Sequence, residues 1–259
     1  MSKPLLVTEY FTGLADVYDA HRPTYPVAAI DFIVSDLTPP IHAADVGCGT
    51  GIASRLLAAR GIHVVGIDPN RDMLERARRA GSPVNNLIEY RYGTGEATGL
   101  ERSCVDLVIC AQSFHWFDAA AALAEFHRIL RPGGRLALVW NVKDRADSFT
   151  AGFCAVAERA QHDAAQRGLA VPPDRSADPS SEYFEIIDRA AFPNVQQLDL
   201  QGVLARAHSA SYFPREGPLR EQLDNDLRCL FEQHQRDQHV QLMYRTEVTL
   251  AKQRSEPQT

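Results

Sequence analysis

The chain has 259 residues, of which 45% are hydrophobic and 23% charged, a balance typical of globular proteins. Its net charge is −6 and no basic cluster stands out, so we expect neither nucleic acid nor a membrane as a partner. The five cysteines form no Cys-x-x-Cys pair and the nine histidines show no paired ligand spacing, so we expect no metal. The N-terminus shows no apolar signal region, which predicts a cytoplasmic protein.

The N-terminal residues are predicted to be helical. Apolar residues at helical spacing predict a helix over residues 8–20, and this helix ends where Arg22 precedes a proline. Pro26 suits the first turn of a second helix that runs to about residue 37.

From residue 42 onward, short apolar strands alternate with helices. Strands are predicted at 42–46, 63–68, 87–92, 105–111 and 135–140, and helices at 51–60, 70–80 and 119–130. This alternation predicts an α/β fold of the Rossmann-like kind, with a doubly wound, mostly parallel seven-stranded sheet and helices on both faces. After residue 140, we expect helices at 149–168 and 219–235, strands at 195–200 and 241–250, and an exposed loop at 171–181.

A glycine-rich loop lies where the first strand turns into the next helix, with the sequence Asp45-Val-Gly-Cys-Gly-Thr-Gly51. Glycines there let the backbone turn sharply and approach a ligand without a Cβ atom in the way. The spacing differs from the Gly-x-Gly-x-x-Gly dinucleotide fingerprint and from a P-loop. A nucleoside ligand without phosphates therefore suits the loop.

Asp68 ends the second strand, nineteen positions after Gly49. A carboxylate at about this distance from a glycine loop accepts hydrogen bonds from ribose hydroxyls. The alternative is that Asp68 only caps the following helix, a position that aspartate also favours.

As an ordered set, these residues resemble the class I S-adenosylmethionine-dependent methyltransferases, in the small-molecule, type 11-like subgroup. The resemblance covers residues 45–140. It is carried by the glycine loop and by four later segments, Val65-Gly-Ile-Asp68-Pro, Gly93-Thr-Gly-Glu96-Ala, Val105-Asp-Leu-Val-Ile-Cys-Ala-Gln112 and Arg128-Ile-Leu-Arg-Pro-Gly-Gly134.

This resemblance implies how the cofactor is held. The glycine loop would contact the methionine moiety, Asp68 the ribose and Met73 the adenine, although Met73 also suits a helix core. Many relatives bind the adenine amino group with an aspartate where this chain has Thr94, so Glu96 or a backbone carbonyl would replace it. The predicted cofactor residues are Arg22, Asp45, Gly47, Cys48, Gly49, Gly51, Asp68, Pro69, Met73, Gly95, Glu96, Ala111 and Gln112.

The segment that follows the fourth predicted strand is rich in aromatic and histidine residues, as a pocket wall would be. His115 suits a general base because its ordinary pKa is near neutral; the alternative is a neutral imidazole that hydrogen-bonds cofactor or backbone. Trp116 and Tyr212 suit either the pocket or packing. The predicted substrate residues are Tyr18, His115, Trp116 and Tyr212.

Three short segments, at residues 15–26, 208–214 and 244–246, are similar to a subset represented by trans-aconitate methyltransferase-like proteins. In that subset, aromatic and arginine residues near the N-terminus close over the cofactor. Arg22 would then pair with the methionine carboxylate through its planar fork. The alternative is a surface arginine at a helix end.

The resemblance implies a methyltransferase that uses S-adenosylmethionine, releases S-adenosylhomocysteine and modifies a small-molecule O-, N- or C-nucleophile by in-line displacement. A nicotinamide-dependent oxidoreductase and a non-catalytic cofactor-binding protein are the alternatives. We expect a single domain over residues 1–259, with an N-terminal helical cover (1–40), a cofactor-binding core (41–142), a substrate lid (143–220) and a C-terminal helix with the last strand (221–259).

Overall fold

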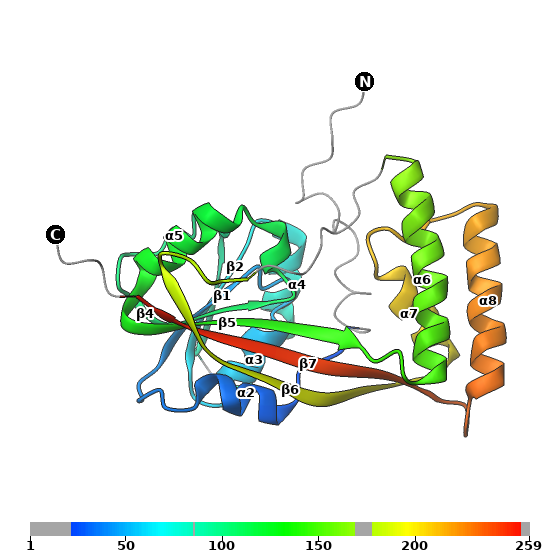
Figure 1. The fold of residues 1–259 in the computed structure, drawn as a ribbon, viewed down its shortest axis with the longest axis horizontal. Helices are drawn as coiled ribbons and strands as arrows, with labels where there is room; N and C mark the ends of the chain where they lie inside the picture. Colours follow the sequence, from blue (N-terminus) through cyan, green and yellow to red (C-terminus); the bar gives the residue numbers. More distant parts are fainter. Residues whose placement is uncertain (1–21, 85, 169–177, 255–259) are drawn as a thin grey trace.

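The computed structural model describes residues 22–84, 86–168 and 178–254 (Figure 1). The helix predicted at 8–20, including Tyr18, lies outside the described residues. The described elements are α2 (Val27–Val34), β1 (His42–Val46), α3 (Ile52–Ala58), β2 (His63–Asp68), α4 (Arg71–Ala80), β3 (Ile88–Tyr92), β4 (Val105–Ala111), the 3₁₀ turn η2 (Phe114–Trp116), α5 (Ala119–Ile129), β5 (Leu130–Lys143), α6 (Ser148–Gln166), β6 (Phe184–Leu198), α7 (Leu200–His208), α8 (Pro218–His234) and β7 (Val240–Gln253).

The strands form one seven-stranded sheet in the order β3-β2-β1-β4-β5-β7-β6. Strands β1 to β5 pair in parallel, whereas β7 pairs antiparallel with both β5 and β6. The predicted mostly parallel α/β fold is therefore confirmed. Because β1 lies between β2 and β4, the chain changes direction along the sheet at this point, and ligands bind beyond the carboxyl ends of strands at such a switch point.

Helices cover both faces of the parallel strands, and β4 shows this most clearly. Leu107 and Ile109 are fully buried in a cluster with residues of α2 and α3. Val108 and Cys110 point the other way, into a cluster with residues of α5. A strand that is buried on both faces has a nearly continuous apolar sequence, which explains why the bounds of β4 were predictable.

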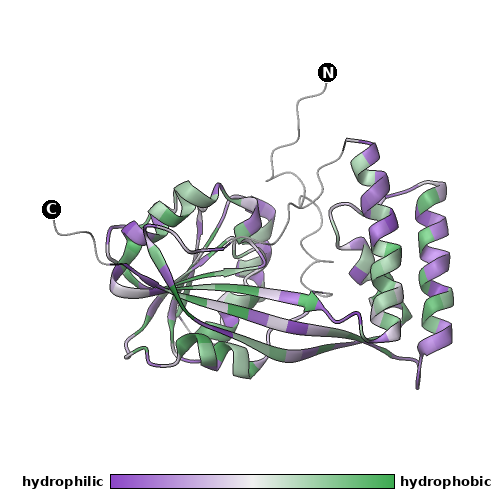
Figure 2. Cartoon of the chain, in the orientation of Figure 1, coloured by the Kyte–Doolittle hydropathy of each residue, from purple (hydrophilic) through white to green (hydrophobic). Residues whose placement is uncertain are grey.

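A third apolar core lies beyond the parallel strands, where α6, α7 and α8 gather at the far ends of β5, β6 and β7 (Figure 1). Phe153, Leu227 and Leu242 are buried there. Figure 2 shows apolar colours along the sheet and both colours on α6 and α8, as expected for helices with one buried side. None of the helices in the described ranges is both long and apolar enough to cross a lipid bilayer.

Two strands differ most from their predicted bounds. β5 begins at Leu130, so the Arg-Pro-Gly-Gly segment between the helix predicted at 119–130 and the strand predicted at 135–140 lies within it, opposite an irregularity in the pairing with β4. β6 starts at Phe184 instead of residue 195, because it is an edge strand whose polar outer positions hide the alternation. The short helix α7 was not predicted; Asp199 begins it by accepting a hydrogen bond from the Gly202 N–H at 2.7 Å.

The burial of β4 predicts a large cost for truncating its side chains. Leu107→Ala is expected to lower the free energy of unfolding by about 2–5 kcal/mol, because Leu107 is completely buried and the surrounding side chains cannot fill the cavity. Urea denaturation of both proteins measures the difference. Val195→Ala on β6 is the matched control, since Val195 is 51% exposed and should change stability by less than about 0.5 kcal/mol. Equal losses in the two variants would contradict the assigned core.

Candidate functional site

A cavity lies at the switch point. Its volume is about 1240 Å³ when the open solvent at its mouth is included. Its walls come from the loops that follow β1, β2 and β4, the end of β5, and the region of α7 and the loop after it. The residues that line it are Arg22, Tyr25, Asp45, Gly47, Cys48, Gly49, Thr50, Ile52, Ala53, Asp68, Pro69, Asn70, Met73, Ala111, Gln112, Ser113, His115, Trp116, Phe117, Lys143, Arg206, Ala210, Ser211 and Tyr212.

The glycine loop after β1 takes a shape that side chains would prevent. Gly47 and Gly51 have φ values of +70° and +80°, in the left-handed region. A Cβ atom on Gly47 would lie 2.4 Å from the Ser113 Cβ atom, and one on Gly51 would lie 2.2 Å from the Tyr90 hydroxyl oxygen. Around Gly49 there is open space, so the loop presents bare backbone to the cavity at this position.

Asp68 ties this loop to the end of β2. Its Oδ2 atom accepts a hydrogen bond from the Gly49 N–H at 2.9 Å, and its Oδ1 atom accepts one from the Asn70 N–H at 2.8 Å. Asn70 is the N-cap of α4, so Asp68 does not serve as the helix cap. Burial raises the pKa of Asp68 to about 6, although both hydrogen bonds act in the opposite direction. Each oxygen has capacity for a further donor from the cavity.

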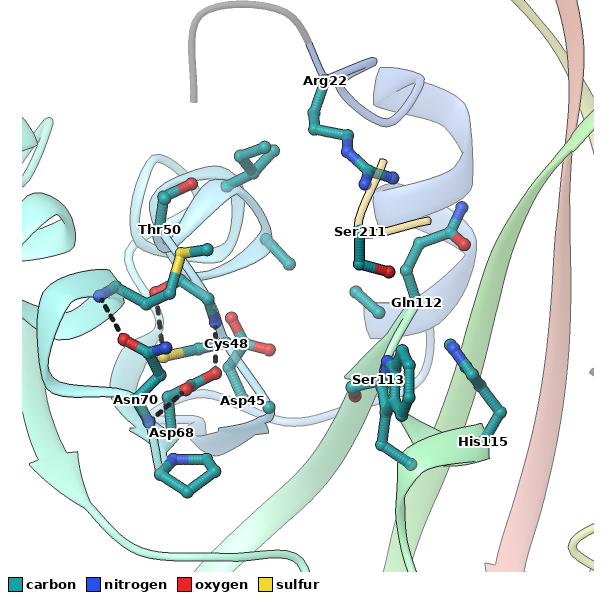
Figure 3. A pocket seen from close by; sticks show the side chains of 18 of the residues that line it. Arg22, Asp45, Cys48, Thr50, Asp68, Asn70, Gln112, Ser113, His115 and Ser211 are labelled. Atoms are coloured by element: carbon teal, nitrogen blue, oxygen red, sulfur yellow. Dashed lines mark hydrogen bonds between the residues drawn. The ribbon is translucent and has the colours of Figure 1, made fainter. Parts of the chain in front are cut away.

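Asp45 is a second carboxyl group on the same wall, and it is fully buried (Figure 3). The Ser54 hydroxyl donates to its Oδ2 atom at 2.6 Å. Its Oδ1 atom accepts no hydrogen bond from any residue that the structure describes. Burial, reinforced by the charge of Asp68, raises the pKa of Asp45 to about 6. A cation in the cavity would stabilise the ionised form of both carboxyl groups.

The opposite wall begins at the end of β4, where the 3₁₀ turn carries His115 and Trp116. The His115 ring lies between two indoles, with centroids 4.8 Å from Trp116 and 5.1 Å from Trp140. The Ser113 hydroxyl fixes this turn to β1 by donating to the Val46 carbonyl at 2.6 Å. Figure 3 shows His115, Ser113 and Gln112 across the cavity from Cys48 and Asp68.

Most of the predicted site residues are brought together by the fold. Those that line the cavity are Arg22, Asp45, Gly47, Cys48, Gly49, Asp68, Pro69, Met73, Ala111, Gln112, His115, Trp116 and Tyr212. Arg22 is half-buried and donates to the Ser209 carbonyl at 3.1 Å, which ties the N-terminal segment to the end of α7. Tyr18 lies outside the described residues.

Three predicted cofactor residues, Gly51, Gly95 and Glu96, do not line the cavity. A Cβ atom on Gly95 would lie 2.6 Å from the ring of Phe117, so Gly95 gives that wall residue its space. The Glu96 carboxylate accepts a hydrogen bond from the Asp118 N–H at 2.8 Å, at the start of α5. Gly51 is the N-cap of α3, where its missing side chain makes room for Tyr90.

Several lining residues were not predicted from the sequence. Thr50 and Asn70 lie directly beside predicted residues, so proximity to the motifs was an available signal. Lys143 and Arg206 lie at the end of β5 and on α7, and no local pattern marked either residue. No group of three or more potential metal ligands was found within the described ranges.

Residues 44–138, which contain the glycine loop and the first parallel strands, match the model of a family described as a methyltransferase domain. An uncharacterized methyltransferase of Mycobacterium bovis is 40% identical over 134 residues, which make up 52% of this chain and 53% of that protein. An uncharacterized methyltransferase-like protein of Schizosaccharomyces pombe is 35% identical over 147 residues, 56% of each protein. The chain therefore spans about half the length of the curated relatives it matches.

Structural similarity extends over more of the chain. A candidate type II methyltransferase from Anaeromyxobacter dehalogenans superimposes with a TM-score of 0.58 at 24% identity and covers 90% of this chain and 96% of its own. At that identity the match shows a shared fold. The chain therefore contains a segment that matches a methyltransferase domain, within an α/β fold shared with this structure.

Proposed function

We propose that this protein transfers the methyl group of S-adenosylmethionine to a small-molecule acceptor, with S-adenosylhomocysteine as the second product. The observation that carries the proposal is the pair of buried carboxyl groups, Asp45 and Asp68, beside the glycine loop at the switch point. The cofactor carries a sulfonium and an ammonium group, and a buried acidic wall is suited to such a cation.

The cofactor residues have distinct roles in this proposal. Asp68 accepts hydrogen bonds from the ribose hydroxyls, and the Oδ1 atom of Asp45 faces the methionine ammonium group. Met73, which is buried on α4 and lines the cavity, lies against the adenine. Arg22 binds the methionine carboxylate through its planar fork, from the wall opposite Asp68 (Figure 3).

The bound cofactor would supply an electrophilic methyl group, so the protein needs mainly to position the acceptor in line with it. The 3₁₀ turn after β4 is suited to this task, because the Ser113 hydrogen bond fixes it against β1. Trp116 and Tyr212 form walls for the acceptor, and His115 accepts the proton that the nucleophile loses. The two flanking indoles restrict the His115 ring, which keeps the base in one orientation.

The two alternative functions have less support. A dinucleotide would need a pyrophosphate site, and the loop lacks the Gly-x-Gly-x-x-Gly spacing that provides one. A non-catalytic protein would not need a restrained imidazole beside the cofactor site. Both the acidic composition and the enclosed cavity support a small-molecule acceptor rather than nucleic acid. All five cysteines are free thiols, which supports a reducing setting such as the cytoplasm.

The direct test is to measure the binding of S-adenosylhomocysteine by calorimetry. We expect saturable binding, and we expect Asp68→Ala to weaken it by about 1.5–3 kcal/mol, or roughly 10- to 150-fold, because charge-assisted hydrogen bonds are lost. Asp188→Asn is the control, since Asp188 is exposed on the edge strand β6. Folded wild-type protein that shows neither heat nor thermal shift would refute the proposed function.

The raised pKa of Asp45 predicts a pH-dependent stability in the ligand-free protein. The folded pKa of about 6 exceeds the ordinary value of 3.8, so the folded state holds this proton more tightly than the unfolded chain. The resulting stabilisation is complete below about pH 4 and is lost as the pH rises to 6. Asp45→Asn should therefore be more stable than wild type at pH 8, by about 2–3 kcal/mol, and the difference should shrink toward pH 4. Urea denaturation of both proteins between pH 4 and pH 8 measures this difference. A difference in the free energy of unfolding that does not change with pH would contradict the raised pKa of Asp45.

His115→Ala tests the base. With acceptors drawn from a panel of phenols and amines, whose nucleophiles lose a proton, the variant should lose about 100-fold or more in kcat, because the proposed general base is removed. S-adenosylhomocysteine binding should stay within about twofold of wild type, since the cofactor wall is unchanged. Unchanged turnover in the variant would reduce His115 to a lining residue.

A further inference from the structure

The charges of the cavity are separated between its two sides. Its described acidic lining residues are Asp45 and Asp68, both on the wall formed by β1 and β2. Its described basic lining residues are Arg22, Lys143 and Arg206, which come from three other parts of the chain. In the proposed function the acidic wall and Arg22 bind the cofactor, whereas Lys143 and Arg206 have no assigned role.

Arg206 is a buried arginine, with only 7% of its surface exposed. Its Nε–H group donates to the Tyr244 hydroxyl at 3.1 Å, and an NH1 donor lies 3.3 Å from the Ser209 hydroxyl. Arg22 donates to the carbonyl of the same Ser209. Two guanidinium groups are therefore held close to one residue at the edge of the cavity.

Lys143 reaches this place from the sheet. It ends β5, and its register partner on β7 is Tyr244, the residue that receives the Arg206 hydrogen bond. Its Nζ atom lies 5.8 Å from the centroid of the Phe153 ring, which gives the ammonium group an aromatic contact. The register of β5 and β7 thus brings Lys143 and Arg206 together, although sixty-three positions separate them in the sequence.

These cations stand at the junction of two spaces. A small recess adjoins the first cavity, with about 390 Å³ of space when the open solvent at its mouth is included. Arg22, Lys143 and Arg206 line both cavities, and all the described residues that line the smaller one are basic or uncharged. An acceptor in the first cavity, beside the 3₁₀ turn that carries His115, would have these three cations at the junction with the recess.

Cationic side chains that converge on a partly desolvated space attract an anion more strongly than they would in water. Arginine also presents a planar set of donors that matches two oxygens of a carboxylate or phosphate. Arg22 already has a carboxylate partner in the proposed cofactor. We propose that the methyl acceptor carries an oxyanion group, carboxylate or phosphate, which Arg206 and Lys143 bind while His115 faces the nucleophile. This inference rests on the proposed function, since it concerns the acceptor half of the same cavity.

The test uses full-length protein saturated with S-adenosylhomocysteine and calorimetric titration with small probes. Succinate and glutarate represent carboxylates, glycerol phosphate represents phosphates, and succinamide and glycerol are the uncharged counterparts. We expect at least one anion to bind saturably and the uncharged probes not to bind. The anion that binds identifies the chemical source of the oxyanion.

Two variants assign the binding to the proposed residues. Arg206→Gln and Lys143→Gln should each weaken anion binding by at least about tenfold, as expected for loss of a hydrogen bond to a charged group. S-adenosylhomocysteine affinity should stay within about twofold of wild type. Arg245→Gln is the matched control, because Arg245 follows Tyr244 on β7 but is exposed and pairs with Glu247. Lys143 is only partly buried, so its variant tests the idea even if loss of the buried Arg206 affects folding.

The outcomes separate this inference from the proposed function. If wild-type protein fails to bind S-adenosylhomocysteine, the proposed function fails. If it binds S-adenosylhomocysteine but no anion, or if anion affinity is unchanged in both Arg206→Gln and Lys143→Gln, only the oxyanion inference is overturned.

Discussion

The bridge that Asp68 makes between two backbone N–H groups determines the geometry of the cofactor wall. One oxygen holds the glycine loop at Gly49, and the other holds the start of α4 at Asn70. The loop is held a second time by the Ile67 carbonyl, which accepts from the N–H groups of Gly47 and Cys48 at 2.8 and 3.0 Å. The end of β2 thus holds both the glycine loop and the start of α4 on this wall of the cavity.

This arrangement has an energetic cost, because two carboxyl groups are buried next to each other. Burial raises the pKa of both Asp45 and Asp68 to about 6, so ionising them costs more in the empty folded site than in the unfolded chain. Burial of the large apolar clusters on both faces of the sheet stabilises the fold and offsets this cost. A cationic ligand of the kind we propose would offset the same cost on binding, so the buried carboxyl groups would favour a cation over a neutral ligand.

The sequence predicted the parallel half of the molecule well because each feature there is local. The bounds of β1, β2 and β4 follow from short, mostly apolar runs between turn residues. β6 was predicted too short because Asp188, Arg189 and other polar residues break its alternation on the free edge of the sheet. The cofactor residues lie within motifs, whereas Lys143 and Arg206 meet only through the pairing of β5 with β7 and the packing of α7. No single-sequence pattern contains that information.

The same division explains what the relatives share. The family match ends at residue 138, just before the last residues of β5, so it contains both cofactor carboxylates but neither Lys143 nor Arg206. A separate apolar core from α6, α7 and α8 lies on the side of these cations, and α7 carries Arg206. This core shares no buried residue with the clusters on the two faces of the sheet. Under the proposed function, acceptor specificity would therefore depend on the cations at the junction of the two cavities, which lie outside the segment that carries Asp45 and Asp68.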